Sequence, residues 1–110
     1  MKYINEIEKY IAIGFEWDKW NTEKIYNKHK VFPYEAEEVF VNEPVIGNLP
    51  ESLNKYGEKR YLSYGRTNAN RLLTVIFTLR NHKIRIISAR DMSKKERRLY
   101  HEENKKTASI

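Results

Sequence analysis

Apolar residues near the start of the chain recur first at helical and then at strand spacing. Ile4, Ile7 and Ile11 share one face of a helix that Gly14 can end with a left-handed cap. The next four residues, FEWD, alternate aromatic and acidic side chains, which predicts a half-buried strand.

Two further helices are predicted before residue 42. The first has Asn21 or Thr22 as its N-cap and runs to about Lys30. The second lies in FPYEAEEVF, where Pro33 suits the first turn. Its apolar side chains share one face and comprise Ala36, Val39 and Phe40.

From Pro44 onward the period is that of strands. PVIGNL predicts a short strand and residues 50–58 a polar loop. Three successive strands are then predicted in KRYLSYG, RLLTVIFTLR and KIRIISAR, the last two joined by a turn at Asn81 and His82. This turn sets Arg80 opposite Lys83, Thr78 opposite Arg85 and Leu73 opposite Arg90. One face is then apolar (Leu73, Val75, Phe77, Leu79, Ile84, Ile86) and the other polar (Thr74, Thr78, Arg80, Lys83, Arg85).

The last predicted element is a helix with a capping box. Ser93 is followed three residues later by Glu96, so the helix should begin at Lys94 and direct Leu99 inward, and residues 104–110 should form a flexible tail. The whole pattern predicts one α+β domain over residues 1–110, with N-terminal helices, an antiparallel sheet of about four strands and a C-terminal helix.

Charge is distributed unevenly between the two halves. Residues 1–55 hold 7 Lys or Arg against 10 Asp or Glu, whereas residues 56–110 hold 14 against 5. A basic second half favours anionic partners, although a surface that only keeps the protein soluble would show the same excess of positive charge. The chain has no cysteine, which suits a reducing cytoplasm, and we expect neither a secretory signal nor a membrane span.

Few motifs for catalysis are present, and the candidates are mostly cations. There is no glycine-rich phosphate loop and no nucleophile elbow, and the three histidines, His29, His82 and His101, are too scattered to predict a metal site. Arg80 and Arg85 should project from the same polar face, where two guanidinium groups match a phosphodiester. The predicted register places Arg90 at the end of the apolar face, where it requires either a carboxylate partner or an anion at a rim.

The predicted C-terminal helix carries a second group of cations. Lys94, Lys95, Arg97 and Arg98 lie in its first turns, where positive charge opposes the helix dipole, so a partner explains them better than helix stability does. Three tyrosines are candidates for stacking on bases, although packing is the commoner role of such residues: Tyr61, Tyr64 and Tyr100.

Taken together, these segments resemble the BrnT family of type II toxins, whose fold is related to that of RelE-type ribonucleases. The resemblance runs from residue 15 to about 103 through FEWD, NTEKIYNKHKV, EAEEVF, RYLSYGRT, RLLTVIFTLR and KIRIISARDMSKKERRLY. It implies a metal-independent endoribonuclease without a cofactor that slows growth. It also implies an antitoxin similar to BrnA, with a ribbon-helix-helix part through which the complex would bind operator DNA. The chain departs from the family in residues 1–14 and at Lys30, where glycine is common.

The resemblance also singles out residues, comprising Lys28, His29, Glu37, Arg66, Arg80, Arg85 and Arg90. The four arginines are candidates for phosphate binding and transition-state stabilisation, because arginine stays protonated. His29 is the first candidate for general acid or base, with Glu37 orienting it or acting as base itself; a packing role for His29 is equally open. Candidates for RNA binding are Lys28, Lys94, Lys95, Arg97, Arg98 and Tyr100.

Two other functions remain open at this point. One is a family member without catalysis that binds RNA or its antitoxin. A DNA-binding regulator acting alone is weaker, because the sequence contains no evident helix-turn-helix.

Overall fold

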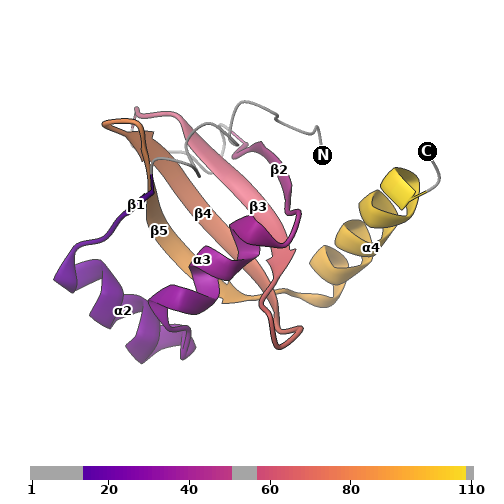
Figure 1. Ribbon diagram of the computed structural model, residues 1–110, viewed down its shortest axis with the longest axis horizontal. Helices are drawn as coiled ribbons and strands as arrows, with labels where there is room; N and C mark the ends of the chain where they lie inside the picture. The colour runs from indigo at the N-terminus through magenta and orange to yellow at the C-terminus, as the bar shows by residue number, and fades with distance from the viewer. Residues whose placement is uncertain (1–13, 51–56, 109–110) are drawn as a thin grey trace.

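The computed structural model describes residues 14–50 and 57–108, which form a five-stranded sheet with helices on both faces (Figure 1). The elements in chain order are β1 (Phe15–Glu16), α2 (Lys19–His29), α3 (Pro33–Val41), β2 (Val45–Asn48), β3 (Arg60–Arg66), β4 (Leu72–Arg80), β5 (Lys83–Asp91) and α4 (Lys94–Ala108). The sheet order is β1-β5-β4-β3-β2, with β1 parallel to β5 and all other pairs antiparallel. The α+β class is confirmed, with a mixed sheet of five strands instead of four antiparallel ones. The helix predicted over Ile4 to Gly14 lies outside the described residues, as does most of the predicted 50–58 loop.

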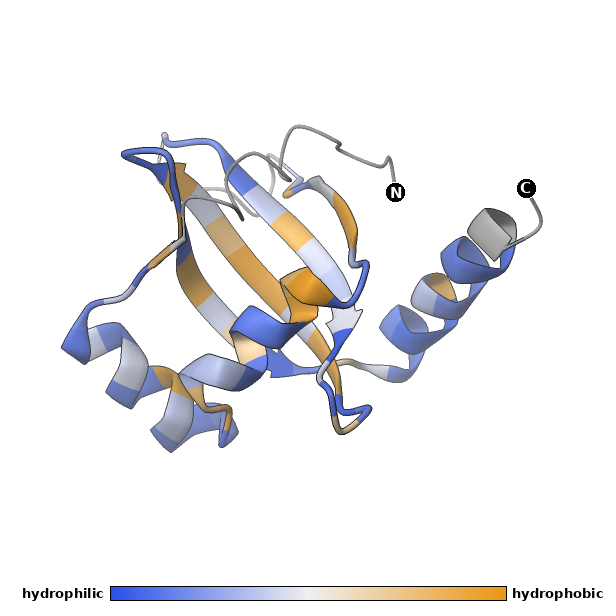
Figure 2. Ribbon diagram, viewed as in Figure 1, coloured by the Kyte–Doolittle hydropathy of each residue, from blue (hydrophilic) through white to orange (hydrophobic). Residues whose placement is uncertain are grey.

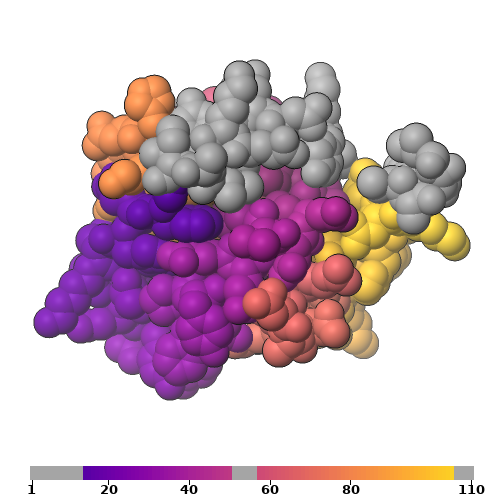
Figure 3. All heavy atoms as spheres, in the orientation of Figure 1, coloured from indigo at the N-terminus to yellow at the C-terminus, as the bar shows by residue number. Residues whose placement is uncertain are grey.

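Helices α2 and α3 cover one face of the sheet and enclose the main core. Figure 2 shows apolar residues along the middle strands beneath α3, and Figure 3 shows α2 and α3 forming one continuous face, with α4 to one side. The core joins alternate residues of the sheet to the apolar faces of these helices; its members include Ile25, Val39, Phe40, Leu73, Val75, Phe77, Ile84 and Ile86. The predicted apolar face of the hairpin is therefore confirmed, since each of its six residues lies in this core or packs against it.

The N-cap of α2 differs from the predicted one, and its C-terminal end keeps an unusual backbone. Asp18 caps the helix by accepting a 2.6 Å hydrogen bond from the backbone N–H of Asn21, so the prediction of Asn21 or Thr22 as the cap is wrong. At the other end Lys30 is left-handed, with φ of 57°. This is the conformation for which glycine is favoured, so the family's commoner residue and this lysine serve the same helix end. Pro33 is the first residue of α3, as predicted.

The β4–β5 hairpin has the predicted turn but a different register at its far end. Asn81 and His82 both have positive φ, and Arg80 pairs with Lys83 and Thr78 with Arg85. A bulge then shifts the pairing, since Phe77 is opposite Ile86 but Ile76 is opposite Ser88. One extra residue reverses the side on which every later side chain projects. Arg90 is therefore opposite Thr74, on the polar face, and the prediction that Arg90 lies opposite Leu73 on the apolar face is wrong.

The second face of the sheet packs against α4. Val45, Tyr64, Met92 and Tyr100 form a smaller apolar cluster there. The helix continues to Ala108, so residues 104–108 are helical and not the flexible tail that the sequence predicted. Leu99, predicted to point inward, is 40% exposed, and the adjacent Tyr100 is the buried residue. No helix in the described ranges has the length and apolar content needed to cross a membrane.

Gly65 of β3 provides a test of how closely α3 lies on the sheet. A Cβ atom at this position would lie 2.5 Å from Cγ1 of Val39. We expect Gly65→Ala to lower the free energy of unfolding by about 1–3 kcal/mol through overpacking. In urea denaturation, the double variant Gly65→Ala/Val39→Ala should lose less free energy of unfolding than the two single variants lose together. Strictly additive losses would contradict this contact.

Candidate functional site

The structure divides the predicted site residues between two ends of the sheet. Arg80 and Arg85 lie at the β4–β5 turn, whereas Arg90 pairs with Thr74, six residues from Arg80 along β4. At a rise of roughly 3.3 Å per residue the two ends are about 20 Å apart. A single phosphate cannot contact both groups.

At the turn end, both arginines are paired with carboxylates. Arg80 lies 3.3 Å from Glu58, and Arg85 lies 3.1 Å from Glu16 and also pairs with Asp18. Arg85 thus connects β1 and the N-cap of α2 to β5. Arg80 and Arg85 share a face, as predicted, but a phosphate there would compete with these carboxylates.

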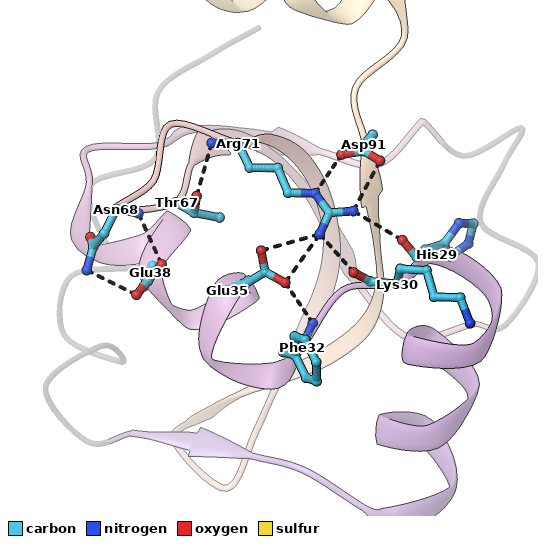
Figure 4. Close-up of polar contacts among 9 residues, drawn as sticks. All are labelled: His29, Lys30, Phe32, Glu35, Glu38, Thr67, Asn68, Arg71 and Asp91. Atoms are coloured by element: carbon cyan, nitrogen blue, oxygen red, sulfur yellow. Dashed lines mark hydrogen bonds and ion pairs between the residues drawn. The ribbon is translucent and has the colours of Figure 1, made fainter.

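At the opposite end, a single guanidinium connects α2, α3 and the ends of β4 and β5. Arg71 donates to both oxygens of Asp91 at 2.8 and 3.1 Å and to Glu35 at 3.2 and 3.3 Å. It also donates to the backbone carbonyl oxygens of His29, at 3.2 Å, and Lys30, at 2.8 Å (Figure 4). We call this set of contacts the Arg71 clamp. Arg71 is not among the predicted site residues, because it lies at the junction of a predicted loop and a predicted strand.

Arg90 lies on the polar face, and it has a carboxylate partner, one of the two alternatives that the sequence left open. Glu96 accepts from its guanidinium at 2.6 and 2.9 Å. The same carboxylate accepts from the backbone N–H of Ser93 at 2.8 Å, while Ser93 Oγ accepts from the backbone N–H of Glu96 at 3.2 Å, which confirms the predicted capping box. Although burial opposes ionisation, these hydrogen bonds and the charge of Arg90 lower the pKa of Glu96 to about 2. One carboxylate therefore joins β5 to the start of α4.

His29 is the last residue of α2 and lies at the same end of the sheet as Arg90. Burial lowers the pKa of His29, and the positive charges of Lys28 and Arg90 lower it further. A neutral imidazole near pH 7 suits a general base, because it can accept a proton. The Arg71 clamp holds the backbone carbonyl of His29, which fixes the helix end that carries the ring.

Arg66 is exposed at the end of β3. The strand register places Arg66 and Arg90 on the same face of the sheet. The turn after Arg66 is held against α3, because Asn68 donates to Glu38 from its backbone and its side chain, both at 3.0 Å (Figure 4). Arg66 thus extends from a fixed strand end toward solvent.

Glu37 is directed away from His29. Its carboxylate accepts a 2.8 Å hydrogen bond from the indole Nε1 of Trp17, next to the start of α2. His29 lies at the other end of this 11-residue helix, roughly 16 Å along its axis. The structure therefore does not bring Glu37 and His29 together, and Glu37 holds the β1–α2 connection against α3.

The predicted RNA-binding residues differ in accessibility. Five cations are exposed, comprising Lys28 on α2 and Lys94, Lys95, Arg97 and Arg98 on α4. Tyr100 is only 3% exposed and packs in the smaller apolar cluster, so its ring is not available to stack on a base, contrary to the prediction. Within residues 14–50 and 57–108, no group of three or more His, Asp or Glu side chains is arranged to hold a metal ion.

The comparisons agree with the fold. A family model described as the ribonuclease toxin BrnT of type II toxin–antitoxin systems matches residues 17–96. The 1.1 Å crystal structure of the Brucella abortus ribonuclease toxin BrnT has a similar fold, with a TM-score of 0.54 and 22% sequence identity over 74% of this chain and 97% of that one. No curated protein sequence matches the chain.

The match to the family model places the chain in the class of type II ribonuclease toxins. Within this class the chain belongs to the BrnT family, since the match spans most of its length. Membership of a type II system implies an antitoxin as partner.

The Arg71 clamp predicts a large effect of one substitution. Arg71→Ala leaves Glu35 and Asp91 without their cation and removes the donor to two carbonyl groups, so we expect the free energy of unfolding to fall by about 2–4 kcal/mol. Arg71→Lys should not restore it, because an ammonium group lacks the planar fork that contacts these partners together. Urea denaturation would measure both, with exposed Arg98→Ala as a control that changes stability by less than about 0.5 kcal/mol. A similarly small loss for Arg71→Ala would refute the clamp.

The Arg90–Glu96 pair predicts a pH-dependent contribution to stability. Because the pKa of Glu96 in the folded protein is about 2, against an ordinary 4.5, the pair stabilises the fold above pH 4.5 and its contribution is lost as the pH falls toward 2. We expect Glu96→Gln to lower the free energy of unfolding by about 1–3 kcal/mol at pH 7 and to approach the parent near pH 2. Denaturation at several pH values would measure this convergence, and a constant difference would contradict it.

Proposed function

We propose that this protein is the toxin of a type II toxin–antitoxin pair and that it cleaves RNA as a metal-independent endoribonuclease, acting in the cytoplasm. The observation that carries the proposal is that His29, whose pKa is lowered by burial and by nearby positive charge, lies at the same end of the sheet as Arg90, in a chain that matches the family of ribonuclease toxins. The partner that neutralises it would be an antitoxin similar to BrnA, with operator DNA bound only through that antitoxin.

RNA cleavage of this kind needs a base for the 2′-hydroxyl proton and cations for the charged phosphorane. His29 is assigned as the base, since a lowered pKa keeps its imidazole neutral at pH 7. Arg90 and Arg66 are assigned to the phosphate, since they share one face and one end of the sheet. The leaving 5′-oxygen takes a proton from the imidazolium that the first transfer creates or from water.

The exposed cations beside this end are assigned to the flanking phosphates. Lys94, Lys95, Arg97 and Arg98 lie in the first turns of α4, directly after the strand that carries Arg90, and Lys28 precedes His29. Such contacts supply affinity for RNA without sequence preference. Arg80, Arg85 and Glu37 are given structural roles in this proposal, because each has a partner far from His29.

A binding module without catalysis is the second candidate, and a specific observation favours it. Arg80, Arg85 and Arg90 are all paired with carboxylates, so the cations would have to exchange partners to bind a phosphate. Expression with and without the adjacent small gene separates the two functions. Growth arrest and RNA fragmentation only in the absence of that gene are expected for the toxin, whereas growth unaffected by the protein alone would favour the binding module.

Purified variants test the assignment of residues. We expect Arg90→Ala to lower the rate of RNA cleavage about 100-fold through lost charge stabilisation. Arg80→Ala, an arginine at the opposite end of the sheet, is the matched control and should stay within about three-fold of the parent. Glu96→Gln keeps the Arg90 cation and shows how much of the loss comes from the ion pair alone. Equal rates for all variants would overturn the assignment, and loss of cleavage in EDTA would overturn metal independence.

The base assignment predicts a particular pH profile. A general base is active when deprotonated, so cleavage should fall as the pH drops through the pKa of His29, with a midpoint below the ordinary value of 6.5. His29→Gln should lower the rate roughly 100-fold or more and remove this limb of the profile. An unchanged limb in that variant would exclude His29 as the base and leave the phosphate site standing.

A further inference from the structure

Three exposed aromatic rings form a continuous stack where α2 meets α3, outside the site described above. Tyr26, Phe32 and Tyr34 are 36%, 44% and 59% exposed. The ring centroids of Tyr26 and Phe32 are 4.6 Å apart, and those of Phe32 and Tyr34 are 5.8 Å apart with their planes inclined by only 13°. We call these three residues the aromatic row. Exposed apolar groups gathered in this way mark a binding surface more often than isolated ones do.

Lys30 covers one end of the row, whereas the ring at the other end is the most exposed of the three. The Nζ atom of Lys30 lies 5.1 Å from the ring centroid of Tyr26, and Phe32 stacks between its two neighbours. Tyr34, the most exposed of the three, is the terminal ring. A further planar group would extend the stack on Tyr34.

The backbone that carries the row is held by Glu35, which belongs to the same Arg71 clamp that holds His29. Glu35 accepts a 3.0 Å hydrogen bond from the backbone N–H of Phe32 and pairs with Arg71. Figure 4 shows His29, Lys30 and Phe32 arranged around the Arg71 guanidinium. A backbone segment fixed before binding loses little conformational entropy when a ligand stacks on the rings that it carries.

The charge along α2, the helix that carries Tyr26, favours a polyanion, and Lys30 is the lysine that lies against the row. From Lys19 to Lys30 the exposed side chains include four lysines (Lys19, Lys24, Lys28 and Lys30) but a single carboxylate, Glu23. Two of these lysines, Lys24 and Lys28, line a shallow hollow of about 410 Å³ beside Trp20 on the outer face of α2. The first carboxylates of α3 are directed into the fold, since Glu35 pairs with Arg71 and Glu37 accepts from Trp17.

We propose that the aromatic row is a stacking platform for single-stranded RNA, with an unpaired base lying on Tyr34 while Lys30, whose Nζ lies over Tyr26, contacts the backbone. This inference deepens the proposed function and takes the identity of its ligand from it. Bases offer their faces only when they are out of a duplex, and aromatic platforms flanked by cations bind such strands with little sequence preference. The site thus specifies single-stranded regions as the substrate class.

The test measures binding separately from cleavage. The probe is a fluorescein-labelled single strand of about 12 nucleotides in 2′-O-methyl RNA, which cannot be cleaved because its nucleophile is methylated. In fluorescence anisotropy at one fixed salt concentration, Tyr34→Ala should raise Kd roughly ten-fold, whereas Tyr34→Phe should stay within about two-fold. Val41→Ala, an exposed apolar residue at the other end of α3, is the matched control and should bind like the parent. Thermal melting of each variant confirms that it is folded.

A second probe shows whether the base itself is the ligand. On a single strand of the same length that lacks bases, the parent and Tyr34→Ala should have equal Kd values. A parental Kd of Tyr34→Ala on the first probe would overturn the proposal. If that variant also bound its antitoxin more weakly, the row would instead be a protein interface.

The outcomes also separate this inference from the proposed function. A parent that binds the probe through Tyr34 but leaves natural RNA intact would refute the endoribonuclease and keep the platform. A Tyr34→Ala variant with parental binding, in a protein that cleaves RNA, would refute the platform and keep the endoribonuclease.

Discussion

The geometry at the end of the sheet where we propose the active site depends on one guanidinium, that of Arg71. It reaches two carboxylates and two backbone carbonyl groups that lie between 20 and 42 residues away in the sequence. Among the described residues it supplies the polar contacts between the end of α2 and the ends of β4 and β5, and apolar packing alone would not fix the direction of the helix end. The fork of an arginine fixes angle as well as distance, because its donors lie in one plane. The position of His29 relative to Asp91, and therefore to the adjacent Arg90, follows from this constraint.

The bulge in the β4–β5 hairpin is the second feature that sets the position of Arg90. It acts by changing the face of the sheet on which the later side chains of β5 project. Ile87 is the additional residue between Ile86, opposite Phe77, and Ser88, opposite Ile76. Without it Arg90 would project into the core among aliphatic side chains, where an unpaired charge is costly. With it Arg90 reaches Glu96, and because Glu96 also caps α4, the same residue sets where the C-terminal helix starts. A backbone irregularity and a capping box thus cooperate to place the cations of α4 beside Arg90.

How much of this the sequence predicts depends on the range of the interactions. The α3 start at Pro33, the capping box at Ser93 and the turn at Asn81 and His82 are local, and each was predicted correctly. The cap at Asp18 was missed because Asn21 and Thr22 offer equally good side chains within the same turn. The bulge had a signal, since two consecutive isoleucines, Ile86 and Ile87, interrupt the alternation that the predicted register assumed. No signal in the sequence indicates the role of Arg71, because its partners come together only when three separate elements pack.

The candidate site residues show the same difference between local and long-range interactions. Sheet alternation correctly put Arg80 and Arg85 on one face, yet it cannot reveal that Glu58, Glu16 and Asp18 lie within reach of them. These carboxylates occupy positions that a phosphate would take. Arg90 is also paired, but among the described residues it pairs with Glu96 alone, whereas Arg85 pairs with both Glu16 and Asp18. Glu96 and Asp18 each keep a backbone N–H donor, so a phosphate would displace one such carboxylate at Arg90 but two at Arg85. This difference, together with His29 at the same end of the sheet, is the physical reason for proposing the cleavage chemistry at the α4 end.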